Sequence, residues 1–191
     1  MLKTAAYLKP KIIRIISFSL IAFFHLIFLV ALILEKKNAF PISFLLILFL
    51  FLTTVTYYKA PLIHEEHFIE DFIAIVFVTL GAISTYTVTH YLKTGPVLAA
   101  GIIGTMASFI PTINRDSRLF KLAPASIYCG CFVGMSHQDV APNYSFIIIA
   151  GVITGLFMVI SKGVFHGFGG KLGTIAFGGV VFTSFLLFLL Y

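Results

Sequence analysis

Residues 72–91 read FIAIVFVTLGAISTYTVTHY, and this stretch decides the class of fold. It contains no Asp, Glu, Lys or Arg, whereas Asp71 directly precedes it and Lys93 follows closely. A helix of about 20 apolar residues crosses the roughly 30 Å hydrocarbon core of a bilayer. The stretch therefore predicts a transmembrane helix.

Six further stretches share this apolar character and are separated by short charged segments. The seven stretches are 12–34, 40–58, 72–91, 96–113, 122–136, 144–161 and 172–191. Hydrophobic residues make up 60% of the 191 residues and charged residues 10%, whereas a soluble domain has about 25% charged residues. The sequence predicts an all-α integral membrane protein, a polytopic bundle of about seven transmembrane helices within one domain, 1–191.

The fifth stretch, 122–136, is short for a span. As a straight helix it covers only about 22 Å, so a full span and a re-entrant segment both stay open. With seven spans, ten Lys and Arg residues lie on the inner side and three on the outer; a re-entrant segment changes this to eight and five. Because basic residues concentrate in cytoplasmic loops, seven spans are favoured. This places the N-terminus in the cytoplasm and the C-terminus outside, in a bacterial inner membrane.

A weak internal repeat has an offset of 50 residues. It aligns Ala100-Gly101 with Ala150-Gly151 and Lys121-Leu122 with Lys171-Leu172. Such a repeat would arrange the last four helices as two tandem parallel hairpins, as in some small transporters. Chance similarity between apolar segments is the alternative explanation.

Glycine divides the chain into two parts. Residues 12–71 contain no glycine and are interpreted as peripheral helices with an inner acidic and histidine-containing loop. Residues 72–191 form a glycine-rich, functional half, in which small residues allow helix backbones to approach closely. The pairs that predict such contacts are Gly130 with Gly134 and Gly151 with Gly155. Cys129 and Cys131 are interpreted as small packing residues.

Two polar stripes are candidates for lining a pathway. Each follows helical spacing on one face of its predicted helix; the residues are Thr79, Tyr86 and His90 on the third helix, and Thr105, Ser108 and Thr112 on the fourth. The structural interpretation is that these hydroxyl groups bond to helix carbonyls or to each other. The functional alternative is that the two stripes face one another and line a path for a small neutral or anionic solute.

Two inner loops are candidates for binding an anion. Glycines before the last helix could expose backbone N–H groups beside a positive helix terminus, and the preceding inner loop is also basic. The residues are Gly167, Gly169, Gly170, Lys171, Arg115 and Arg118. We expect them to form a vestibule for an anionic solute or a lipid headgroup. The alternative is a tight turn that carries ordinary positive-inside charge.

The loop before residue 72 is a candidate metal site. His64, His67 and Asp71 are spaced i, i+3 and i+7, so one helical face could offer two imidazoles and a carboxylate to a divalent transition metal. A solvated acidic helix start is the alternative, since carboxylates are favourable there. No other cofactor is predicted.

These patterns favour transport over catalysis. No acidic or basic residue lies near the middle of any apolar stretch, which argues against a proton pump that uses intramembrane carboxylates. The net charge of +6 is spread over loops, which indicates contact with the lipid bilayer rather than with nucleic acid. The sequence favours a homo-oligomeric channel or transporter for a small neutral or anionic solute. The alternatives are a membrane enzyme that acts on a lipid or quinone at a His/Glu metal site, and a structural subunit of a membrane complex.

Overall fold

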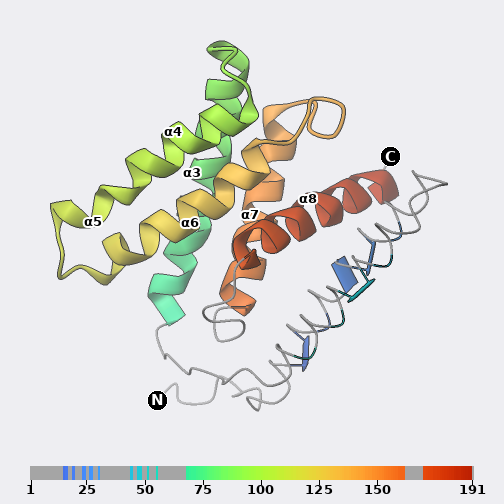
Figure 1. The fold of residues 1–191 in the computed structure, drawn as a ribbon, viewed down its shortest axis with the longest axis horizontal. Helices are drawn as coiled ribbons and strands as arrows, with labels where there is room; N and C mark the ends of the chain where they lie inside the picture. The colour runs from blue at the N-terminus through green and yellow to red at the C-terminus, as the bar shows by residue number, and fades with distance from the viewer. Residues whose placement is uncertain are drawn as a thin grey trace. The chain divides into compact units, whose positions relative to one another are not determined.

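The computed structural model describes residues 68–161 and 170–190, together with scattered positions between 15 and 55. The described part is helical (Figure 1). Its helices are α3 (Phe68–Tyr91), α4 (Pro96–Ser108), α5 (Ile110–Ile113), α6 (Arg118–Gly134), α7 (Tyr144–Ile160) and α8 (Lys171–Leu190). The chain divides into two compact units, residues 1–65 with 160–169 and residues 66–159 with 170–191. The first two predicted spans fall mostly outside the described residues.

Three helical segments are long and apolar enough to cross a membrane. They are Phe72–Tyr91, Pro96–Ile113 and Lys171–Leu190, and Tyr144–Ile160 is a shorter apolar helix. The prediction of an all-helical, multi-pass membrane protein is confirmed to this extent. Many large apolar side chains on these helices are exposed, including Met106 and Phe188, as expected of surfaces that contact lipid.

The fourth predicted stretch is two helices rather than one. The break falls at Phe109, whose N–H donates to the carbonyl of Met106 three residues earlier, at 3.2 Å. Pro111 explains it, because proline has no N–H to donate to residue i−4 and its ring crowds that carbonyl. The chain continues as the single turn of α5 in nearly the same direction (Figure 1).

α6 runs parallel to α3 as one uninterrupted helix. A Cβ added at Gly130 would lie 2.8 Å from the Ala82 nitrogen, and one at Gly134 would lie 2.8 Å from the Thr85 Cβ. The contacts on both helices therefore advance in the same direction along the chain. α6 begins at Arg118, four residues before the predicted apolar stretch, and spans 17 residues despite Pro124 in its interior. α6 is not among the helices that are long and apolar enough to cross a membrane, so a full span of the fifth stretch stays a prediction.

α7 packs on another face of α3 and runs antiparallel to it. A Cβ at Gly151 would lie 3.0 Å from the Thr79 Cα, and one at Gly155 would lie 2.7 Å from the Ile75 Cα. Both predicted glycine pairs thus allow close packing against α3. The core that α3 shares with its neighbours consists of small and branched side chains, among them Val78, Ala82, Cys129, Val133, Ile147, Ala150, Ile175 and Ala176.

Candidate functional site

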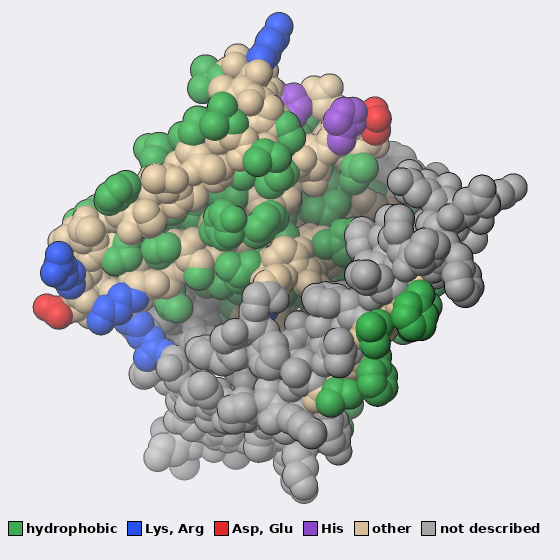
Figure 2. All heavy atoms as spheres, viewed as in Figure 1, with side chains coloured by type: hydrophobic (Ala, Val, Ile, Leu, Met, Phe, Trp, Pro, Cys, Tyr) green, Lys and Arg blue, Asp and Glu red, His purple; other side chains and the backbone are tan. Residues whose placement is uncertain are grey.

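Charged side chains of the described residues gather at the helix ends, and the face shown in Figure 2 is largely apolar between them. Three basic residues, Arg115, Arg118 and Lys121, belong to the turn between α5 and α6 and the first turn of α6. Lys93 lies in the turn between α3 and α4, and Asp139 lies in the loop between α6 and α7. This distribution is typical of helices that cross an apolar layer.

Lys171 departs from this distribution, because the first turn of its helix contacts a core residue of α6. The carbonyl of the next residue, Leu172, accepts a hydrogen bond from Cys129 Sγ at 3.4 Å. Cys129 is fully buried and belongs to the same core cluster as Val78 and Ala82, which lie near the middle of α3. Lys171 itself is half-buried, and Gly170 before it is exposed. α8 therefore starts beside α6, near Cys129 (Figure 1).

The local backbone explains how α8 can start there. Gly170 has φ +82°, a conformation that residues with a side chain rarely adopt. Its carbonyl accepts the N–H of Thr174 at 3.0 Å and the Thr174 hydroxyl at 3.2 Å. Gly170 therefore begins the hydrogen bonding of α8 and leaves Lys171 in its first turn. Of the predicted anion-binding loop, Gly167 and Gly169 lie outside the described residues.

The sequence did not reveal this placement. Lys171 is the last charged residue before an apolar stretch, so its position along the chain assigns it to a helix end. Its proximity to a core residue of α6 follows from the contact between Leu172 and Cys129. The expectation that charged groups stay away from the middle of the helices holds along each helix, but Lys171 directly precedes a contact with a core residue of a different helix.

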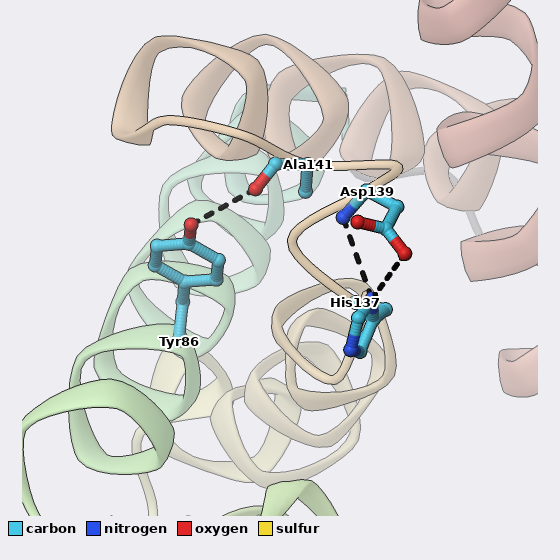
Figure 3. Close-up of polar contacts among 4 residues, drawn as sticks. All are labelled: Tyr86, His137, Asp139 and Ala141. Atoms are coloured by element: carbon cyan, nitrogen blue, oxygen red, sulfur yellow. Dashed lines mark hydrogen bonds and ion pairs between the residues drawn. The ribbon is translucent and has the colours of Figure 1, made fainter.

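Near the C-terminal end of α3, the side chain of Tyr86 binds the loop between α6 and α7 (Figure 3). Its O–H donates to the Ala141 carbonyl at 2.9 Å, and the residue is only 4% exposed. Its ring stacks on His90, with centroids 4.0 Å apart, and meets Tyr144 edge-on at 5.2 Å. Asn143 Oδ1 then caps α7 by accepting the N–H of Phe146 at 2.9 Å. These contacts fix the loop to α3.

The exposed part of the same loop carries an ion pair. His137 Nδ1 lies 3.1 Å from Asp139 Oδ2, with side chains that are 80% and 89% exposed. Figure 3 shows that the pair lies on the same loop as Ala141, the acceptor of the Tyr86 hydrogen bond. Exposed pairs of this kind contribute little to stability, so the loop depends mainly on the buried Tyr86 contact.

Tyr86→Phe is expected to lower the melting temperature of the purified protein by about 2–4 °C, as a loss of about 1 kcal/mol does for a chain of this size. The variant keeps the ring stacking but leaves the Ala141 carbonyl without its donor. The matched control is Tyr91→Phe, since Tyr91 is 76% exposed. Thermal unfolding in detergent measures both variants. Identical melting of the two would mean that the Tyr86 hydrogen bond does not hold the loop.

The predicted stripe on α3 is engaged with its own helix and with α7. The Thr79 hydroxyl donates to the Ile75 carbonyl at 2.9 Å, and Thr79 lies against Gly151. His90 Nδ1 lies 2.8 Å from the Tyr86 carbonyl oxygen. These side chains of the stripe therefore make contacts with the backbone of α3 and with α7.

The predicted stripe on α4 has a different environment. Thr105, Ser108 and Thr112 are all exposed. The Ser108 hydroxyl donates to the Thr105 carbonyl and the Thr112 hydroxyl to the Phe109 carbonyl, both at 2.6 Å. The structure thus places Thr79 and Tyr86 toward α7 and the loop after α6, and leaves the α4 stripe on the surface.

The surface of α4 and α5 has two faces that the sequence analysis did not separate. The polar stripe of Thr105, Ser108 and Thr112 continues to Gly101, where an added Cβ would meet no atom within 4 Å. The other exposed face is wholly apolar and follows helical spacing; we call it the apolar stripe, and it consists of Leu98, Ile102, Met106, Phe109 and Ile113. The steps of three and four residues between its members could have identified it from the sequence.

The turn between α5 and α6 is held by Asn114. Its Oδ1 accepts the N–H groups of Asp116 and Ser117, both at 3.1 Å. Ser117 precedes α6 without a side-chain capping bond, and the first turn of α6 contains no acidic residue. The basic side chains of this turn therefore stand at a helix start that has no capping carboxylate.

The predicted metal cluster falls largely outside the described residues. His64 and His67 are not among them, and only the backbone of Asp71 is. Among the residues that the structure describes, there is no group of three or more His, Cys, Asp or Glu side chains that could hold a metal ion. Cys129 and Cys131 are both buried free thiols, consistent with their predicted role as packing residues.

Comparison with known proteins adds no functional assignment. No protein-family model, no curated protein and no solved structure matches this chain. The functional argument therefore depends on the residues and contacts described above.

Proposed function

We propose that the protein is a small multi-pass channel or transporter for a small solute, neutral or anionic, with the anionic class favoured. The observation that supports the proposal is the position of Lys171, which is half-buried and directly precedes Leu172, whose carbonyl contacts the core residue Cys129. Ionisable side chains at depth in a membrane protein are costly, and they commonly mark a pathway for substrate or ions.

A lysine in this position favours an anionic solute for electrostatic reasons. An ammonium group attracts an anion more strongly in the low-dielectric interior than in water. The first-turn N–H groups of α8 add a partial positive charge at the same place. Both effects act in the same direction on a solute that approaches the start of α8.

The α4 polar stripe supports a homo-oligomeric assembly. Thr105, Ser108 and Thr112 are exposed in one chain, next to the open position at Gly101. Small and hydroxyl-bearing residues on one helix face favour close contact with another helix in a membrane. We propose that copies of the chain associate through this face, where the same hydroxyls can line part of the path.

The proposed orientation follows from the basic residues. Arg115, Arg118 and Lys121 lie near the end of α5 and the start of α6, and Lys93 lies between α3 and α4, at the other end of α4. Under the positive-inside rule the end with more basic residues faces the cytoplasm. This supports a cytoplasmic position for the turn between α5 and α6, and we propose a bacterial inner membrane with the N-terminus in the cytoplasm and the C-terminus outside.

Solute flux in proteoliposomes that contain only the purified protein tests the proposal. We expect reproducible flux of small anions, above that of protein-free liposomes, in a panel that also includes neutral solutes and monovalent cations. Flux of a neutral solute alone would support transport by the protein but would contradict a role of Lys171 in selecting anions. Absence of flux for the whole panel, with folded protein in the liposomes, would overturn the proposal.

A further inference from the structure

The basic turn and the apolar stripe adjoin one another. The apolar stripe runs along α4 and α5 and ends at Ile113, which is 75% exposed. Arg115 follows two residues later and is also exposed, as is Lys121 in the first turns of α6. An exposed apolar surface thus leads directly to a cluster of positive charge.

The turn carries more basic than acidic residues. Within residues 114–121 the sequence has Arg115, Arg118 and Lys121 and one acidic residue, Asp116. Arg115 and Lys121 are exposed. The side chain of Asn114 holds the turn closed by accepting two backbone N–H groups at 3.1 Å, so these basic side chains start from a fixed backbone. The segment therefore carries a formal net positive charge next to the end of the apolar stripe.

From this arrangement we infer that the turn between α5 and α6 binds an anionic phospholipid, with the phosphodiester at Arg115 and Lys121 and an acyl chain along the apolar stripe. Basic side chains at the edge of the hydrocarbon attract anionic headgroups, and arginine matches the geometry of phosphate oxygens. The apolar stripe offers a surface to the acyl chain of a phospholipid whose headgroup binds the basic residues. A soluble phosphate compound has no acyl chain and gains nothing from this surface. The inference is independent of transport.

The test is binding of single lipids to the purified protein in detergent, followed by native mass spectrometry. Phosphatidylglycerol is titrated against phosphatidylcholine, which has the same acyl chains and no net charge. The main variant is Arg115→Gln/Lys121→Gln, since both side chains are exposed and their replacement leaves the packing intact. Lys93→Gln, at the opposite end of the helices, is the matched control.

We expect phosphatidylglycerol to bind the double variant about 25-fold more weakly than the wild type, since each basic residue near a membrane surface contributes about fivefold. Binding to Lys93→Gln should be unchanged. Asp116→Asn should bind about fivefold more tightly, a gain that loss of folding cannot produce.

The outcomes separate the possible ligands. A tenfold excess of inorganic phosphate should leave phosphatidylglycerol bound, and displacement by it would assign the site to free phosphate and overturn the inference. Equal binding of phosphatidylglycerol by the wild type, the double variant and Asp116→Asn would also overturn it. A preference for phosphatidylglycerol that Lys93→Gln loses as strongly as the double variant would place the lipid elsewhere.

Discussion

Gly130→Ala is expected to lower the free energy of unfolding by about 1–3 kcal/mol, the usual cost of overpacking a closely packed interior. The added Cβ would meet the Val78 carbonyl oxygen and would lie 2.8 Å from the Ala82 nitrogen. Both groups belong to the backbone of α3, so no side chain can rotate away. α3 and α6 would have to separate, which weakens the contacts along the shared core.

The matched control for this prediction is Gly173→Ala, in α8. A Cβ at Gly173 meets no atom within 4 Å, so the change should be neutral or should stabilise the helix by up to about 1 kcal/mol. Unfolding in detergent with increasing sodium dodecyl sulfate, followed by circular dichroism, gives the midpoint for each variant. Similar midpoints for the two variants would show that α3 and α6 do not approach as closely as described.

Most of the described helices could be predicted from the sequence because the larger part of each lies in a charge-free window. α8, at Lys171–Leu190, lies within one residue of the predicted stretch 172–191 at each end. The starts of α3 and α6 were less accurate, and both helices begin four residues earlier than their apolar stretches. Hydropathy marks only the apolar part of a helix, whereas a helix continues through the charged residues at its end when these are favourable or solvated there.

The partners of the glycines could not be predicted, although their role in packing could. The offset of 50 residues aligns Gly101 with Gly151, but Gly101 adjoins open space and Gly151 lies against Thr79. A small residue permits close approach without determining which helix approaches. The polar stripes on α3 and α4 also look alike in the sequence, because their spacing does not show which neighbour each one contacts. In the structure the α3 stripe contacts α7 and the α4 stripe is exposed.

The candidate site at Lys171 could not be predicted from the sequence, because it is formed by a contact between segments that are far apart in the chain. Lys171 and Cys129 are separated by more than 40 residues, and neither has a sequence pattern that distinguishes it from a loop lysine or a packing cysteine. Their proximity follows from the place where α8 meets α6. Charge counting could therefore assign Lys171 to a side of the membrane but not to a depth.

Lys171→Met is expected to reduce anion flux in proteoliposomes at least about tenfold, which corresponds to about 1.4 kcal/mol of lost attraction for the anion. Methionine has nearly the same length and shape as the lysine stem, so the packing beside Cys129 is preserved. Thermal unfolding measured on the same preparation shows whether a loss of flux comes from unfolded protein rather than from the missing charge.

Two further variants identify what the positive charge does. Lys171→Arg keeps the charge and should retain most of the anion flux, although the wider guanidinium can slow it. Lys121→Met removes an exposed charge at the turn between α5 and α6 and should change anion flux by less than about twofold, because solvent screens exposed charges. If Lys171→Met and Lys121→Met both transport anions at the wild-type rate, the half-buried lysine has no part in the pathway. Selective loss in Lys171→Met, with a stable fold, would place the anion beside the start of α8.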